Sequence, residues 1–184
     1  IGQRERIIMS QSNNDMQQEN THESKDHQLK GYMVRKRTEE EIASLAIGQY
    51  LLFNRKKVGL ENIETVVDLL CVEQGIVVHV EGNKKWDKQH SPFKKGESKP
   101  SEKTITIPKR VYDGMKKGRA SDLEVLFHEI GHVILEHSPI YMKADGYTLT
   151  AMDDAEAQAD FFAAVMLRLF EIQLPIMQLE LDLT

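Results

Sequence analysis

The stretch SDLEVLFHEIGHVILEH, residues 121–137, decides the fold that we predict for this chain. His128 and His132 are four residues apart in it, so a helix would present both imidazole rings to a single point, as a metal ion requires. Ser121 and Glu124 have the spacing of a capping box, which predicts a helix start near Ser121. Apolar residues recur at helical spacing and predict a buried face beside the histidines, namely Leu123, Leu126, Phe127, Ile130, Val133 and Ile134.

A second helix is predicted by the stretch DDAEAQADFFAAVMLRLF, residues 153–170. Thr150 and Asp153 have the spacing of an N-terminal cap. Glu156 and Asp160 are four residues apart, so both carboxylates lie on one stripe of a helix whose other residues are mostly apolar or small. Burying a charge without a partner is costly, so these two acids need one.

A zinc ion bound by His128 and His132 would be that partner, with Glu156 as the third ligand. Asp160 would accept the remaining ring N–H of one of the histidines. Small residues on both helices would let the two backbones approach closely, namely Gly131 and Ala155, Ala157, Ala159, Ala163 and Ala164. The alternative is an ordinary amphipathic helix with two surface histidines, beside a second helix with a solvated acidic stripe.

The motif HEIGH at residues 128–132, followed by EAQADFFAA at 156–164, resembles the two signature blocks of the ImmA/IrrE-type zinc metallopeptidases, which are similar to gluzincins at the site. The resemblance implies a zincin-like active-site helix and a second helix that carries a ligand. It implies zinc ligands at His128, His132 and Glu156, a catalytic Glu129 and a supporting Asp160. It also implies a transcriptional repressor as substrate.

Two departures from the family pattern affect what can be transferred. Many members have a histidine four residues after the second ligand, where this chain has Glu136, with His137 one place later. The leucine-methionine-proline ending that is common after the second block is absent after Leu167. His137 is left with two interpretations, a substrate contact or a favourable charge near a helix C-terminus, and we favour the charge.

Composition limits the class of protein. With 184 residues, 40% of them hydrophobic, and one cysteine, the chain can form a single core and no internal disulfide, which fits the cytoplasm. We see no apolar run long enough for a membrane span and no secretory signal. The net charge of −5 argues against general affinity for nucleic acids.

The expected organisation is a flexible polar tail at residues 1–30, followed by one α+β domain at 31–184. We predict helices from Thr38 to about residue 53 and from about residue 60 to 74, ending at Gly75. Strands are predicted at 76–80 and 104–107, the second near a sheet edge because it stops at Pro108. The helices would pack around a small, mostly antiparallel sheet.

Three further segments carry functional alternatives. The lysine-rich residues 83–103 predict a mobile, solvated loop, with contact to a nucleic acid or an acidic partner as the weaker alternative. Tyr141 or Tyr147 would either reach the cleft and stabilise an oxyanion or pack in an ordinary way. Residues 173–184 fit a short strand or an interaction tail.

Together these features predict a cytoplasmic zinc-dependent endopeptidase that hydrolyses a peptide bond in a protein substrate. Glu129 would be the general base for metal-activated water. The competing hypothesis is a partner-binding or regulatory module that keeps zinc for stability and has no turnover. An open cleft at the fourth metal position favours catalysis, whereas a side chain or the N-terminal tail that fills this position favours a structural site or an inhibited enzyme.

Overall fold

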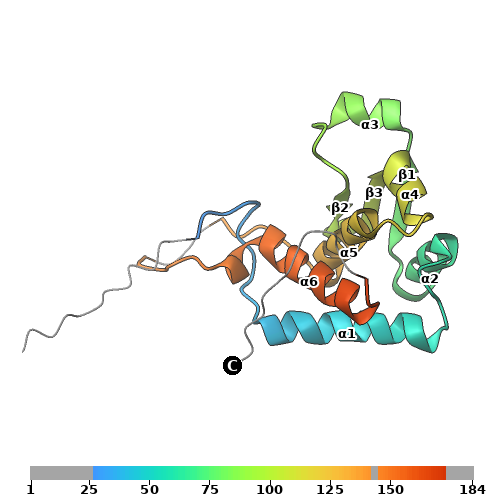
Figure 1. Ribbon diagram of the computed structural model, residues 1–184. Coiled ribbons are helices and arrows are strands. Elements are labelled where there is room, and N and C mark those ends of the chain that lie inside the picture. Colours follow the sequence, from blue (N-terminus) through green and yellow to red (C-terminus); the bar gives the residue numbers. More distant parts are fainter. Residues whose placement is uncertain (1–26, 142–144, 173–184) are drawn as a thin grey trace, which may run out of the picture.

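The computed structural model describes residues 27–141 and 145–172 (Figure 1). Most of the predicted N-terminal tail, and the predicted strand or tail at 173–184, lie outside the described residues. The elements in chain order are α1 (Glu39–Arg55), α2 (Ile63–Gln74), β1 (Val77–Glu81), α3 (Asn83–Gln89), β2 (Glu97–Lys99), β3 (Thr104–Pro108), α4 (Lys109–Met115), α5 (Ala120–Ile134) and α6 (Ala155–Leu169), with short 3-10 turns η1 (Pro100–Glu102) and η2 (Ala151–Asp153). The predicted α+β class is confirmed.

The elements form layers in which α6 packs against α1 on one side and against α5 on the other (Figure 1). The sheet covers α5 from the opposite direction, through β2 and β3. The side chains between these layers are apolar and fully buried, as for Phe53, Phe127 and Phe162. The two helices predicted to carry the metal ligands are therefore neighbours at the centre of the fold.

The three-stranded sheet has the order β1-β3-β2. β1 and β3 are parallel, with Val78 opposite Ile105, and β2 and β3 are antiparallel, with Ser98 opposite Ile105. The sheet is thus mixed, and the prediction of a mostly antiparallel sheet is wrong in this respect. The prediction that residues 104–107 lie near a sheet edge is also wrong, because β3 is the central strand. Pro108 is the last residue of that strand and does not mark a sheet edge. β2 is the edge strand beside α5.

The predicted loop at residues 83–103 is instead ordered as α3, β2 and η1. Its lysines are mostly exposed, as a solvated segment requires, but Trp86 is fully buried. The Trp86 indole N–H donates to the Lys94 carbonyl at 3.0 Å. One aromatic anchor with a satisfied polar end therefore fixes a segment whose composition resembles a loop.

The helix ends test the capping predictions. Thr38 and Glu41 form the expected capping box at the start of α1, and Gly75 ends α2 with a left-handed φ of +68°. α2 begins at Ile63, capped by Asn62, rather than at residue 60. The box predicted at Ser121 is not formed: α5 begins one residue earlier, with Arg119 at the cap position and no side-chain cap bond. The first turn is held instead by an ion pair from Arg119 to Asp122 at 2.7 Å.

Candidate metal site

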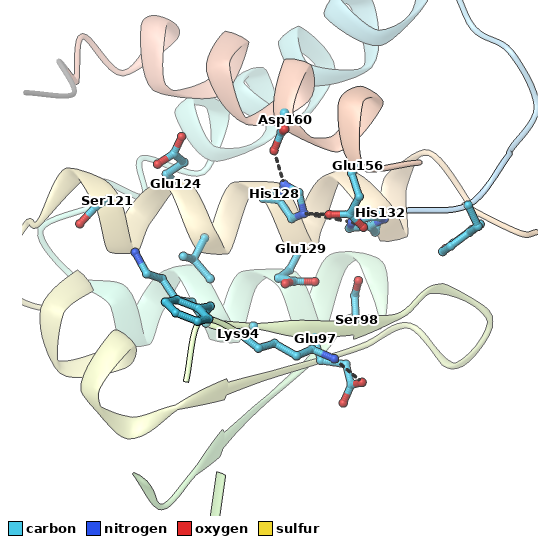
Figure 2. A pocket seen from close by; sticks show the side chains of 15 residues that line it. Lys94, Glu97, Ser98, Ser121, Glu124, His128, Glu129, His132, Glu156 and Asp160 are labelled. Atoms are coloured by element: carbon cyan, nitrogen blue, oxygen red, sulfur yellow. Dashed lines mark hydrogen bonds and ion pairs between the residues drawn. The ribbon is translucent and has the colours of Figure 1, made fainter. Parts of the chain in front are cut away.

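The three predicted ligand side chains converge on one point (Figure 2). The two histidine Nε2 atoms are 3.1 Å apart, and they lie 3.3 Å (His128) and 3.5 Å (His132) from the carboxylate oxygens of Glu156. Four donors arranged tetrahedrally at about 2.1 Å from a metal are about 3.4 Å from one another. The spacing of the donors therefore fits such an ion, and this group could hold a metal ion.

Close packing of α5 and α6 brings the donors together. A Cβ added to Gly131 would lie 3.2 Å from the Phe162 Cβ and 3.3 Å from the Ala159 Cα, so glycine at this position permits the approach. This confirms the predicted close contact of small residues between the helices. The chain before α1 also crosses the site, since a Cβ on Gly31 would lie 2.7 Å from the Glu156 Cγ.

Asp160 contacts the first histidine as the sequence predicts: its Oδ1 lies 2.9 Å from the His128 Nδ1. Burial lowers the pKa of His128, but hydrogen bonds to the Asp160 and Glu156 carboxylates outweigh this effect and raise the pKa to about 10. The hydrogen bond with His128 in turn lowers the pKa of Glu156. The carboxylates of Glu156 and Asp160 therefore favour a positive charge at this point, and the supporting role of Asp160 stays a prediction.

Glu129 is 7% exposed and points from α5 toward β2, on the side where Ser98 lies (Figure 2). Burial raises the pKa of Glu129, as does the charge of Glu156, while His128 and a hydrogen bond with Ser98 lower it. Gly96 leaves the space that the carboxylate fills, because an added Cβ would lie 2.5 Å from the Glu129 Oε1. The position of Glu129 therefore depends on a glycine just before the edge strand.

For the peptide cleavage that the sequence predicts, we expect Gly96→Ala to lower kcat by about 100-fold without changing zinc content, because the new methyl group displaces the Glu129 carboxylate by about 1 Å. Steady-state kinetics and metal analysis would check this. Gly82→Ala is the matched control, since a Cβ there meets no atom within 4 Å, and it should change neither quantity. Unchanged kcat in the Gly96 variant would show that the carboxylate position is not critical.

Sequence reasoning missed the contacts behind the second histidine. His137 is 5% exposed, and its Nδ1 lies 2.8 Å from the His132 Nδ1. Its Nε2 lies 3.1 Å from the Oε1 of the fully buried Gln158. Burial lowers the pKa of His137 to about 4, so the favoured interpretation as a charge at a helix C-terminus is wrong. No residue type in the sequence signals this arrangement.

Asp154 joins the segment before α1 to the site. Its buried carboxylate accepts hydrogen bonds from the backbone N–H groups of Lys30 at 2.7 Å and Gly31 at 3.1 Å, and caps α6 by accepting from Glu156 N at 3.1 Å. The His27 ring also contacts it at 3.0 Å. Asp154 therefore positions both the start of the ligand helix and residues 27–31, four of which were assigned to the predicted flexible tail. The partners lie more than 100 residues away in sequence, so spacing gave no signal.

A pocket of about 590 Å³ opens beside the donors, lined by residues of α5, α6, β2 and the segments before β2 and α1. Tyr32 lines it, and burial raises the pKa of this phenol, as do the charges of Glu156 and Glu129. The two predicted tyrosines do not line it: Tyr141 is 90% exposed, and the Tyr147 hydroxyl donates to Asp153 at 2.6 Å. A phenol that stays protonated beside the donors is available to donate a hydrogen bond.

Comparisons of the chain with models of protein families, with curated proteins and with solved structures found no match. Among the described residues, no helix combines the length and the apolar character that a membrane span requires.

Proposed function

We propose that this chain is an intracellular zinc-dependent endopeptidase of the ImmA/IrrE type, which hydrolyses a peptide bond in a protein substrate. The observation that carries the proposal is the convergence of two imidazole nitrogens and one carboxylate, at tetrahedral spacing, beside the buried carboxylate of Glu129 and an open pocket. Two nitrogen donors and one oxygen donor with access for a small molecule are typical of catalytic zinc sites. By the resemblance in sequence, the substrate is a transcriptional repressor.

The residues divide the chemistry between them. His128, His132 and Glu156 would hold a zinc ion, which would supply a Lewis acid for activating water and polarising a carbonyl. Glu129 takes the proton from the attacking water and delivers it to the leaving amine. Burial raises the pKa of Glu129, which makes its carboxylate a stronger base than an exposed one.

The edge strand β2 lines the pocket beside the donors and a neighbouring cavity, which suggests how an extended substrate would lie. Ser98 of β2 and Tyr32 also line a second cavity of about 850 Å³, which continues past Lys99 and Lys103. The two cavities therefore follow β2 on both sides of the donors. An exposed strand edge can pair with an extended polypeptide through main-chain hydrogen bonds. We infer that the substrate lies along β2, because β2 and not β3 is the edge strand.

Tyr32 is our candidate for stabilising the oxyanion that develops on the substrate carbonyl. We predict that Tyr32→Phe lowers kcat by about 100-fold, leaves KM within about threefold and keeps full zinc occupancy, because the lost hydrogen bond forms only in the transition state. Kinetics with a fluorogenic peptide would separate the two constants. Tyr147→Phe is the matched control, since that phenol binds Asp153. A rise in KM alone would make Tyr32 a binding residue.

The open pocket favours the enzyme over the module without turnover, because it is lined by the three donor residues and Glu129 and leaves the Glu156 side chain 35% exposed. The test is to incubate the purified protein with candidate repressors from neighbouring genes and with a proteome-derived peptide library, and to sequence new N-termini by mass spectrometry. We expect cleavage that a chelator stops, that added zinc restores and that Glu129→Gln lacks. Full zinc occupancy without any such cleavage would favour the module.

A further inference from the structure

His137 lies behind His132 because of the way in which α5 ends. Glu136 follows the helix with a left-handed φ of +54°. Two reverse hydrogen bonds close the turn, from Glu136 N to Val133 O at 3.1 Å and from His137 N to His132 O at 3.1 Å, which is the Schellman arrangement. The turn brings the His137 ring to the Nδ1 of His132, on the opposite side of that ring from the Nε2 that faces Glu156.

The orientation of the Gln158 amide is fixed by its surroundings. Its nitrogen lies 2.9 Å from the Arg35 carbonyl oxygen and 2.7 Å from the Met152 carbonyl oxygen. Carbonyl oxygens only accept hydrogen bonds, so the NH₂ group has to face them and donate both of its protons. The Gln158 Oε1 therefore faces the His137 Nε2 and can only accept from it.

The hydrogen positions along the chain of contacts follow. Because Gln158 Oε1 accepts, the His137 Nε2 carries a proton and donates it. In the neutral ring, the His137 Nδ1 then has a free lone pair, which accepts the proton carried by the His132 Nδ1 at 2.8 Å. The His132 Nε2 is left as a lone pair directed at the three-donor point, and this is the tautomer that a metal ligand needs.

We propose that His137 and Gln158 form a buried relay that holds His132 in the Nδ1–H tautomer before any metal binds. They are positioning residues, since neither contacts the metal point. Such partners commonly fix the ring orientation and tautomer of a ligand histidine. His128 is held differently, by the half-exposed carboxylate of Asp160. The two histidine ligands therefore have separate hydrogen-bond partners. The consequence for zinc affinity rests on the proposed function, whereas the tautomer does not.

The direct test is long-range proton–nitrogen NMR on metal-free protein with ¹⁵N-labelled histidine. We expect a protonated Nδ1 and a bare Nε2 for His132, and the reverse for His137. An Nε2–H tautomer of His132, or a doubly protonated His137 at neutral pH, would overturn the relay. This measurement uses the unmodified protein, so it remains decisive if a variant does not fold.

The second test uses zinc alone as the probe. His137→Phe keeps the ring volume and removes the acceptor for the His132 Nδ1–H, so we expect a zinc dissociation constant 10–100-fold higher and mixed tautomers of His132. Glu136→Gly is the matched control, because glycine readily adopts the left-handed turn, and it should change neither. Unchanged affinity and tautomer in His137→Phe would overturn the proposal. If the unmodified protein bound no zinc, the proposed function would fail while the tautomers still tested the relay.

Discussion

Replacing Glu129 by glutamine is expected to abolish peptide cleavage and to leave zinc content and fold unchanged. Glutamine keeps the shape of the side chain and its ability to contact Ser98, but it cannot accept a proton from water. Loss of a general base typically costs 10²–10⁴-fold in rate. Because burial already disfavours the charged form of Glu129, a neutral amide in its place should not destabilise the fold.

The measurements are kcat/KM on a chelator-sensitive substrate, zinc by mass spectrometry and thermal unfolding by circular dichroism. Glu124→Gln is the control, because Glu124 also lies on α5, lines the same pocket and has a pKa raised by burial. That variant should lose at most a few-fold in kcat/KM. Cleavage retained by Glu129→Gln would remove Glu129 from the mechanism, and a parallel loss of zinc would give it a structural role.

Replacing Glu156 by alanine is expected to weaken zinc binding by at least about 100-fold. Removing a residue that only supports a ligand commonly costs 10–100-fold, so removing a ligand should cost more. His128 and His132 would remain on α5, where they can still bind a metal as a pair, but no longer as three donors at tetrahedral spacing.

Competition with a chromophoric chelator would measure the affinities. Asp160→Asn is the graded control: it keeps a contact with the His128 ring without the charge, and it should weaken binding by about 10-fold. Zinc affinity unaffected by Glu156→Ala would show that the third ligand lies elsewhere in the chain. Equal losses in both variants would mean that overall negative charge, rather than coordination, holds the ion.

The parts of the fold that local spacing controls were predictable. A four-residue interval on a helix puts His128 and His132 on one stripe whatever the rest of the chain does, and the small residues near Gly131 indicated which helix could approach. The strand order was not predictable, because the pairing of β3 with both neighbours depends on contacts between distant segments. The capping box at Ser121 failed for a related reason, since the Arg119–Asp122 ion pair supplies another start for the helix.

Other parts of the site were missed because single residues override the composition around them. The buried Trp86 orders a lysine-rich stretch. Asp154 holds residues 27–31 through hydrogen bonds between segments that are distant in sequence, so no repeating pattern of residues predicts them. The position of His137 depends on a left-handed backbone at Glu136, where a glycine would have signalled the turn and a glutamate does not. The sequence therefore indicated the three donors and the contact of Asp160 with His128, but not the contacts of His137 and Asp154.

The division of the donors between α5 and α6 couples metal uptake to folding. The unfolded chain has no such triad, because only the packing of the two helices places Glu156 against the histidine pair. Under conditions where the ion saturates the native state alone, each tenfold rise in its free concentration adds about 1.4 kcal/mol to the free energy of unfolding. The supply of the ion would then set the fraction of the chain that is folded as well as the fraction that holds the metal.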